Sequence, residues 1–256
     1  MWAPEGGIGL GYKEVPVLAN AQIAENVYSM LVQMDDDIGP GQFYMLRRPD
    51  STVLLPRAIS VCDSAQGKVR FVYELLGEGT KGFSRLRPGD RLCVNGPLGN
   101  SYPVGELRGR VALVGGSSGI APFLYTARVL RERGLEADAF AGFAAQSFLG
   151  EDLREVADRV HIATESGAEG HKGLVTDLLD PAAYGTVLVC GPRGLMRAVV
   201  ERCLAVGTRV YLSMEAKMAC GMGACLVCSC AGADGKNRRA CKDGPIFRGE
   251  EIDFDA

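Results

Sequence analysis

Residues 220–230 read CGMGACLVCSC, and this stretch decides how the chain is interpreted. Three of its cysteines, Cys220, Cys225 and Cys228, have the spacing C-x4-C-x2-C, and Cys241 follows further along the chain. This is the spacing of plant-type [2Fe–2S] sites, in which four thiolates hold the cluster. We therefore predict an iron–sulfur cluster held by these four cysteines.

The residues between the cysteines suit a loop that wraps a cluster. Cluster sulfurs need backbone N–H donors, and Gly221 and Gly223 allow the chain to curl so that its amides point inward. Cys230 is left over, and the choice of Cys228 over it rests on the x2 spacing and on the resemblance given below. A four-cysteine zinc site and a disulfide remain alternatives, although zinc ribbons usually show two C-x2-C knuckles and Cys241 has no knuckle partner.

Length and composition indicate a globular protein with room for two domains, or for one large domain with an appendage. The chain has 256 residues, of which 47% are hydrophobic and 23% charged, and its net charge of −3 gives no electrostatic case for a nucleic-acid partner. No charged-then-apolar leader follows Met1 and no apolar run is long enough to span a membrane, so we expect no signal peptide, no membrane segment and a cytoplasmic location. In that reducing compartment, clustered cysteines are more often metal ligands than disulfides. The two histidines, His161 and His171, lie in no catalytic context.

The segment before residue 105 predicts a small antiparallel β-barrel. Short β-like runs alternate there with Gly and Pro, as is typical of such barrels. The clearest runs are QFYMLRR (42–48), RAISVCD (57–63), VRFVYELL (69–76) and RLCVNGP (91–97).

The pattern changes at about residue 106 to alternating strands and helices, which predicts a doubly wound parallel sheet with ligands at the carboxyl ends of its strands. The predicted strands are 110–116, 137–143, 160–164, 186–191 and 209–213. The predicted helices are 119–134, 150–158, 174–180 and 193–207. The last segment, 214–256, is too short for a core of its own, so we expect it to fold around whatever its cysteines hold.

Two motifs in the barrel segment could bind a flavin, which would exchange electrons with a cluster. In RAIS (57–60), Arg57 could pair with a diphosphate and Ser60 could hydrogen-bond a flavin ring nitrogen. In GEGT (77–80), the turn at Gly79 and Thr80 could present amides and a hydroxyl to the same phosphates. Taken alone, RAIS is weak evidence, because a surface arginine and a strand serine are the simpler interpretation.

Two strand-to-helix turns in the second segment could bind a nucleotide. In VGGSSGIAPF (114–123), a strand enters a glycine-rich turn and then a helix with Pro122 in its first turn, which aims helix N-terminal amides at a phosphate. The Rossmann fingerprint G-x-G-x-x-G is absent. In VLVCGPRGLM (187–196), Cys190 ends a strand at the binding edge of the sheet, although by itself a buried and inert cysteine would be the simpler interpretation.

In this order, these motifs resemble the ferredoxin-reductase-like iron–sulfur flavoproteins, and among them most closely the electron-transfer subunits of class 1B dihydroorotate dehydrogenases. The resemblance spans nearly the whole chain. It is carried by PGQF (40–43), RAIS (57–60), GEGT (77–80), GPLGN (96–100), GGSSGIAP (115–122), CGP (190–192), MEAKMACGMGACLVC (214–228) and CKDGPIF (241–247).

The resemblance implies roles for individual positions. It implies FAD contacts at Arg57, Ala58, Ile59, Ser60, Val72, Tyr73 and Glu74, phosphate contacts at Gly79 and Thr80, and cluster ligation by Cys220, Cys225, Cys228 and Cys241. The nicotinamide-side loops, with Gly115, Gly116, Gly119 and Cys190, match in shape and in the family lie against the open face of the flavin. The chain departs from the family at Ala58, where proline is usual, and in having the extra thiol of Cys230.

The resemblance implies an FAD barrel (1–105), an NAD-binding lobe (106–213) and a [2Fe–2S] segment (214–256). It implies an electron conduit whose partner is an FMN-containing catalytic subunit that oxidises dihydroorotate, assembled as a heterotetramer of two copies of each chain. Electrons would pass through the cluster and FAD to NAD⁺. The small subunits of ferredoxin:NADP oxidoreductases and sulfide dehydrogenases are an alternative, but an aspartate can replace the first cluster cysteine in their bifurcating members, whereas Cys220 stands here. A zinc-stabilised binding module without catalysis is an alternative of another class.

Overall fold

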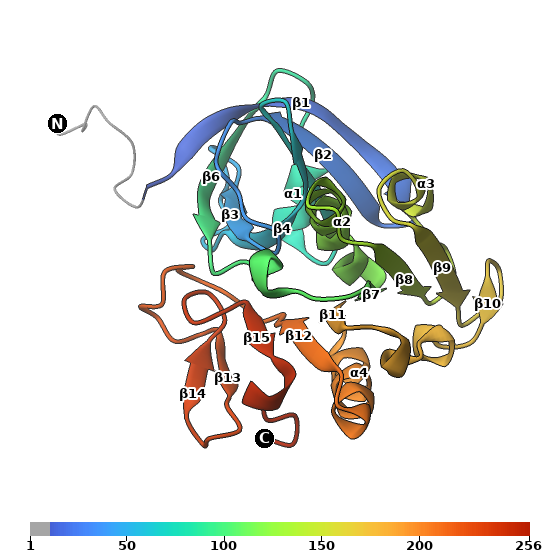
Figure 1. Ribbon diagram of the computed structural model, residues 1–256. Helices are drawn as coiled ribbons and strands as arrows, with labels where there is room; N and C mark the ends of the chain where they lie inside the picture. The colour runs from blue at the N-terminus through green and yellow to red at the C-terminus, as the bar shows by residue number, and fades with distance from the viewer. Residues whose placement is uncertain (1–10) are drawn as a thin grey trace, which may run out of the picture.

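The computed structural model describes residues 11–256, and its first part is the predicted barrel. Six antiparallel strands close in the order β1-β2-β5-β4-β3-β6 (Figure 1). The expectation that no leader follows Met1 lies outside the described residues. The elements are β1 (Lys13–Ala24), β2 (Val27–Gln33), β3 (Phe43–Arg47), β4 (Arg57–Ala65), β5 (Lys68–Glu74), the helix α1 (Glu78–Phe83) and β6 (Arg91–Leu98).

Aromatic rings fill the barrel. Phe71 and Tyr73 project from β5 to the same side because side chains alternate along a strand, and both are almost completely buried. The Tyr44 ring meets Phe71 edge-on at 5.7 Å, and the Phe83 ring meets Tyr73 edge-on at 5.8 Å. Phe83 ends α1, so this contact fixes the short helix against the barrel.

The second part is a sheet of seven strands in the order β10-β9-β8-β7-β11-β12-β15. Neighbouring strands are parallel throughout except for the pair of β12 and β15, which is antiparallel. The predicted parallel sheet is therefore confirmed, with one antiparallel strand at its edge. The strands are β7 (Val111–Gly116), β8 (Ala137–Phe143), β9 (Arg159–Thr164), β10 (His171–Lys172), β11 (Thr186–Cys190), β12 (Arg209–Ser213) and β15 (Ile246–Arg248).

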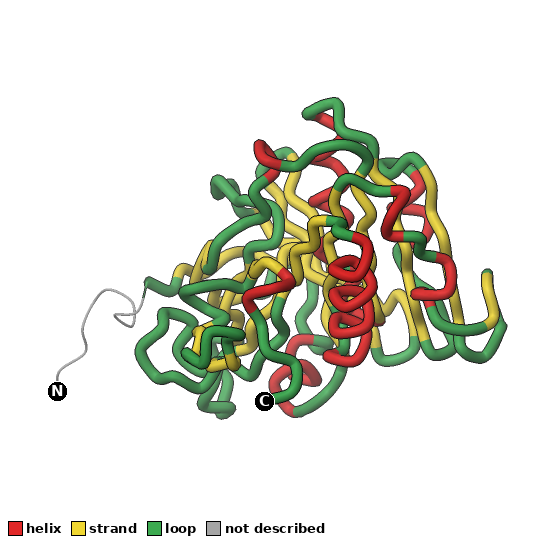
Figure 2. Tube along the Cα trace, turned by 60° about the horizontal axis from the view of Figure 1, so that its bottom comes forward, coloured by secondary structure: helices red, strands yellow, loops and turns green. Residues whose placement is uncertain are grey.

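Helices cover both faces of this sheet (Figures 1 and 2). Leu113 of β7 belongs to the core that α2 (Pro122–Glu132) and α3 (Gly150–Arg154) build, and its neighbour Val114 belongs to the opposite core under α4 (Arg193–Val206). The core under α2 continues into the barrel through Cys62 and Val72, so one apolar core joins the barrel to the sheet. The remaining short turns are the 3-10 segments η1 (Val104–Glu106), η2 (Ser117–Ile120), η3 (Val175–Leu178), η4 (Pro181–Ala183) and η5 (Gly249–Glu251).

Two predicted helices are shorter than their sequence pattern indicated. The helix predicted over 150–158 ends at Arg154, and the helix predicted over 174–180 is only the 3-10 turn η3. Val175 and Thr176 are β-branched and favour helix weakly. The Asp177 carboxylate accepts a hydrogen bond from the Leu174 N–H at 3.0 Å, which stabilises a turn instead of a longer helix.

The cysteine-rich segment is mostly loop and lies beside the barrel and the edge of the sheet (Figures 1 and 2). It contains one small hairpin, β13 (Ser229–Ala231) with β14 (Asn237–Arg239), before β15 joins β12. The segment predicted as 214–256 thus contributes a strand to the sheet of the preceding lobe, and the division into three domains stays a prediction. Among residues 11–256, no helix is both long and apolar enough to cross a membrane.

Candidate functional site

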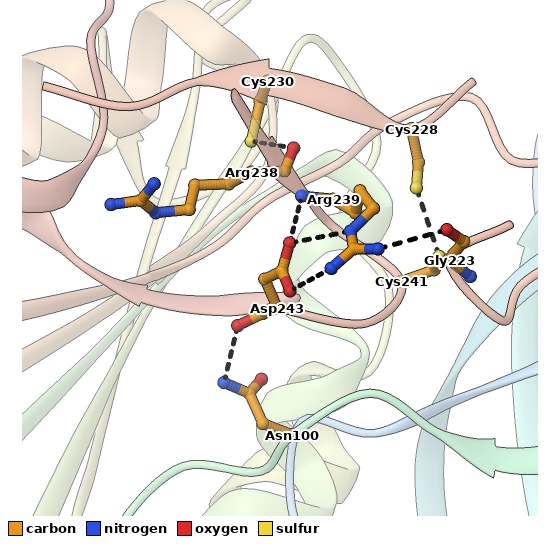
Figure 3. Close-up of polar contacts among 8 residues, drawn as sticks. All are labelled: Asn100, Gly223, Cys228, Cys230, Arg238, Arg239, Cys241 and Asp243. Atoms are coloured by element: carbon orange, nitrogen blue, oxygen red, sulfur yellow. Dashed lines mark hydrogen bonds and ion pairs between the residues drawn. The ribbon is translucent and has the colours of Figure 1, made fainter. Parts of the chain in front are cut away.

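The four predicted ligands lie together as two pairs. The Cys228 and Cys241 Sγ atoms are 3.2 Å apart in a buried position (Figure 3). The Cys225 side chain lies within hydrogen-bonding reach of Cys220 at the more exposed side of the loop. Within residues 11–256, no three His, Cys, Asp or Glu side chains converge on one point. The four cysteines therefore lie as two pairs and are not gathered around a single point.

Backbone amides point at these sulfurs, as predicted from the glycines. Gly221 and Gly223 have φ values of 70° and 82°, in the left-handed region that favours glycine. The Gly223 N–H donates to Cys241 Sγ at 3.1 Å and the Met222 N–H to Cys220 Sγ at 3.4 Å. Burial raises the pKa of the Cys220 thiol, but hydrogen bonds from the Met222, Cys225 and Ala224 amides and from the Cys225 side chain outweigh it and lower the pKa to about 6. The loop thus stabilises thiolate at Cys220, which is the form that binds iron, whereas burial and the neighbouring Cys228 raise the pKa of Cys241.

Cys230 lies apart from the pairs (Figure 3). Its Sγ is 3.6 Å from the Arg238 carbonyl oxygen across the β13–β14 hairpin, and its side chain packs on the core under α4. Cys228 and Cys241 belong to a different apolar cluster, together with Phe43 and Met45 of the barrel. This separation favours Cys228 over Cys230 as a ligand.

A cavity of about 480 Å³ opens between the barrel and the sheet. Most residues expected to contact FAD line it, together with two of those expected on the nicotinamide side. They are Arg57, Ala58, Ile59, Ser60, Val72, Tyr73, Glu74, Thr80, Gly119 and Cys190.

Gly79 does not line this cavity but determines where Arg57 lies. A Cβ at Gly79 would come within 2.6 Å of the Arg57 guanidinium, so any larger residue there would displace the guanidinium. Arg57 donates from Nη1 to the Leu55 carbonyl oxygen at 2.6 Å. Its Nε and Nη2 atoms donate to no group among residues 11–256, so one edge of the guanidinium remains available to a ligand.

The Thr80 hydroxyl is engaged within its own loop. It accepts hydrogen bonds from the Leu76 N–H at 3.0 Å and the Gly77 N–H at 3.3 Å, and it donates to the Gly77 carbonyl oxygen at 3.1 Å. A hydroxyl has one donor and two acceptor positions, so these contacts use all of them. In this structure Thr80 therefore shapes the turn before α1 instead of offering its hydroxyl to the cavity.

Glu74 connects the barrel to the second lobe. Its Oε1 accepts hydrogen bonds from the Ser117 hydroxyl at 2.6 Å and from the Ser118 N–H at 3.3 Å. Both serines belong to η2, directly after β7. The contact closes one side of the cavity and sets the glycine-rich turn against the predicted flavin strands.

The floor of the cavity contains groups that the motifs did not predict. Ser213 ends β12 and Glu215 follows it, and Glu215 Oε1 lies 4.0 Å from Cys190 Sγ. Burial and the nearby carboxylate raise the pKa of the buried Cys190 thiol far above its usual value, so it is protonated and uncharged at neutral pH. Burial and Glu74 raise the pKa of Glu215. These groups lie at the carboxyl end of a parallel strand, where ligands bind in such sheets, and this position could have identified them from the sequence.

The three glycines of the 115–119 turn have different surroundings. A Cβ at Gly115 would lie 2.4 Å from Ile120 Cα, so Gly115 serves close packing. Gly116 lines a second cavity of about 400 Å³ at the same sheet edge, which also includes Glu165 and Thr176. Gly119 lines the first cavity. The turn therefore separates two adjoining cavities.

The first cavity and the buried cysteine pair share a wall. Five side chains that line the cavity also belong to the apolar cluster around Cys228 and Cys241. They are Phe43, Ala58, Met214, Ala216 and Met218.

Comparison with known proteins first defines the class. The fold is that of ferredoxin reductases: a chain from the study "Insights into flavin-based electron bifurcation via the NADH-dependent reduced ferredoxin-NADP oxidoreductase structure" superimposes with a TM-score of 0.85 and 29% identity, covering 98% of this chain and 92% of that chain. A Neisseria gonorrhoeae ferredoxin NADP⁺ reductase with bound FAD and NADP superimposes with a TM-score of 0.66 over 82% of this chain and 96% of that chain, at 17% identity.

Sequence comparison then gives the family. Residues 215–253 match the iron–sulfur cluster binding domain of dihydroorotate dehydrogenase B. The electron transfer subunit of the NAD⁺-dependent dihydroorotate dehydrogenase B from Clostridium perfringens is 43% identical over 96% of this chain and 100% of its own length, and that from Listeria monocytogenes serovar 1/2a is 36% identical over 93% and 98%. The chain belongs to this family of electron transfer subunits, as its motifs predicted.

Proposed function

We propose that the chain carries electrons between an FMN-containing dihydroorotate-oxidising subunit and NAD⁺, through a [2Fe–2S] cluster and FAD. When bound, the cluster exchanges single electrons and the flavin exchanges either one electron or a hydride equivalent, so together they join the two chemistries. The chain itself supplies the binding sites, the spacing between them and the exclusion of water.

The shared wall is the observation that carries this proposal. The buried pair Cys228 and Cys241 is separated from the larger cavity by the side chains of Phe43, Ala58 and three residues of segment 214–218. A cluster on these cysteines and a flavin in the cavity would be neighbours across one layer of apolar side chains. Ala58, where proline is usual in the family, is part of that layer.

The residues of the larger cavity fit FAD. Arg57 offers the unused edge of its guanidinium to a diphosphate. Ser60, Val72 and Tyr73 line the barrel side, and Gly119 and Cys190 face them from the second lobe. The thiol of Cys190 is uncharged at neutral pH and adds no base, and the acidic group beside it in this cavity is Glu215.

The second cavity fits the adenosine portion of NAD. Gly116 at the end of β7 lets a nucleotide approach the carboxyl edge of the sheet. Glu165 is the one charged side chain among the described residues that line this cavity. A carboxylate can accept hydrogen bonds from ribose hydroxyls and repels a 2′-phosphate, so this site favours NAD over NADP.

The exposed part of the cysteine loop fits a protein partner. Met222, Leu226 and Val227 are 44%, 60% and 54% exposed, next to the exposed Cys225. A partner that covers them would bury apolar surface and bring its own cofactor near the cluster. We propose the FMN subunit as this partner, in a heterotetramer of two copies of each chain. All nine cysteines are free, which fits a reducing cytoplasm.

The experiment is reconstitution. The purified chain should have flavin and iron–sulfur absorption, oxidise NADH with an artificial acceptor, and leave dihydroorotate unchanged. Addition of the FMN subunit should couple dihydroorotate oxidation to NAD⁺ reduction. A colourless protein loaded with zinc would support the binding module instead, and turnover with reduced ferredoxin but not with the FMN subunit would support the ferredoxin:NADP oxidoreductase alternative.

A further inference from the structure

The motif GPLGN (96–100) has no role in the sites described so far, yet it covers the end of β6 and continues beside the cysteine segment. Asn100 is its last residue, just beyond β6. The Asn100 side-chain N–H donates to the Ile246 carbonyl oxygen at 2.8 Å, and its Oδ1 accepts from the Ile246 N–H at 2.9 Å. The Asn100 main-chain N–H also donates to the Gly244 carbonyl oxygen at 2.7 Å. The Asn100 side-chain N–H also donates to the Asp243 carbonyl oxygen at 3.5 Å (Figure 3). One residue just beyond β6 thus makes four hydrogen bonds to the backbone that follows Cys241.

The glycine before it permits this approach. Gly99 has a φ of 75°, and a Cβ there would lie 2.4 Å from Pro245 Cδ. Any other residue would push the segment 243–246 away from the barrel. The end of the motif is therefore shaped for close contact with the cysteine segment.

The clamped segment is tied to the cysteine loop by an ion pair (Figure 3). Arg239 Nε and Nη2 each donate to the Asp243 carboxylate at 3.0 Å, and the Arg239 main-chain N–H donates to it at 2.8 Å. Arg239 Nη1 reaches the Gly223 carbonyl oxygen at 3.3 Å. Gly223 is the residue whose N–H donates to Cys241 Sγ. Contacts therefore run without a break from Asn100 to the loop between Cys220 and Cys225.

We propose that Asn100 is a positioning residue that clamps residues 243–246 to the barrel and so sets the distance between the cysteine loop and the flavin cavity. This inference rests on the proposed function, because the distance matters only if electrons cross the shared wall. Electron transfer slows steeply with distance, so a loosened clamp reduces the rate of exchange between the two cofactors without removing either of them.

The test compares Asn100→Ala, which removes the three side-chain hydrogen bonds, with Asn100→Asp, which keeps the acceptor oxygen but places a second oxygen against the Ile246 and Asp243 carbonyl oxygens. Asn95→Ala is the matched control: it lies on the same strand and its side chain makes no hydrogen bond to residues 11–256. The first measurement is hydrogen exchange of peptides covering 243–248 in the full-length protein. Because the side-chain hydrogen bonds of Asn100 hold this segment, Asn100→Ala should exchange at least about tenfold faster there. Asn100→Asp should also exchange faster, because its second carboxylate oxygen would face carbonyl oxygens, and the control should be unchanged.

The second measurement follows the absorbance of cluster and flavin after mixing with NADH. Asn100→Ala should keep its iron content and its rate of flavin reduction but reduce the cluster several-fold more slowly. The proposal would be overturned if hydrogen exchange at 243–248 did not change in Asn100→Ala. It would also be overturned if hydrogen exchange became faster while the rate of cluster reduction stayed the same. Loss of FAD or iron from both variants would also overturn it, since Asn100 would then serve folding alone. If the cluster of the unmodified chain is never reduced by NADH, the proposed function fails, whereas hydrogen exchange still tests the clamp.

Discussion

Each of the four predicted ligands, Cys220, Cys225, Cys228 and Cys241, can be replaced singly by serine. We expect every one of these variants to lose most of the EPR signal of the reduced [2Fe–2S] cluster, because a hydroxyl is a poor substitute for thiolate. Cys230→Ser should keep the signal, since its side chain packs on another core. A signal that survives in Cys228→Ser and disappears in Cys230→Ser would show that the ligand set is wrong.

Arg57 is the residue on which flavin affinity should depend most. Arg57→Ala should weaken FAD binding about ten- to a hundredfold, because a charge-assisted contact to a diphosphate is worth roughly 1.5–3 kcal/mol. Gly79→Ala should act in the same direction, since its Cβ would displace the guanidinium. Titration of the flavin-free protein with FAD measures both effects. Unchanged dissociation constants would refute the role of Arg57.

Glu165 should decide which nicotinamide nucleotide is used. Glu165→Gln removes the repulsion of a 2′-phosphate while it keeps the size of the side chain, so the KM for NADPH should fall several-fold and the KM for NADH should rise. Glu169→Gln, four positions along the chain and outside the second cavity, is the control. Steady-state diaphorase assays with both nucleotides make the comparison. An unchanged preference in Glu165→Gln would exclude this role.

Among the elements, α2 is fastened to the barrel strand β4 by one ion pair. Arg128 Nε and Nη2 donate to the Asp63 carboxylate at 3.0 and 2.7 Å. Asp63→Asn should lower the free energy of unfolding by about 1 kcal/mol, and less at high salt, because the pair is partly exposed. Asp50→Asn breaks the more exposed ion pair with Arg48 and should lower the free energy of unfolding by less. Thermal unfolding at two salt concentrations distinguishes these outcomes. Equal effects of both substitutions would contradict the claim that the Arg128–Asp63 pair fastens α2 to β4.

The sequence allowed the barrel, the order of strands and helices and the grouping of the cysteines to be predicted, because each depends on local periodicity or on spacing. It did not predict that β15, within the cysteine segment, pairs with β12, since three residues carry too weak a pattern. The backbone of Pro245 and Ile246 is held by Met214 and Asn100, which are distant in sequence. The Thr80 hydroxyl was expected to face phosphates, but local backbone groups use it. Glu215 was missed although it lies just beyond the carboxyl end of the predicted strand 209–213, because only folding brings its carboxylate to Cys190.

In the whole molecule, the central claim is that electrons cross from the cysteine cluster to the flavin cavity through the wall formed by Phe43, Ala58 and residues 214–218. The most direct measurement uses the complex of this chain with its FMN subunit and replaces Cys228, which is buried away from the proposed partner surface, by serine. Size-exclusion chromatography first establishes that the variant still assembles. We predict that its diaphorase activity with NADH persists while dihydroorotate-dependent reduction of NAD⁺ is lost. Coupled turnover at the unmodified rate in a variant that has lost its cluster would contradict the account.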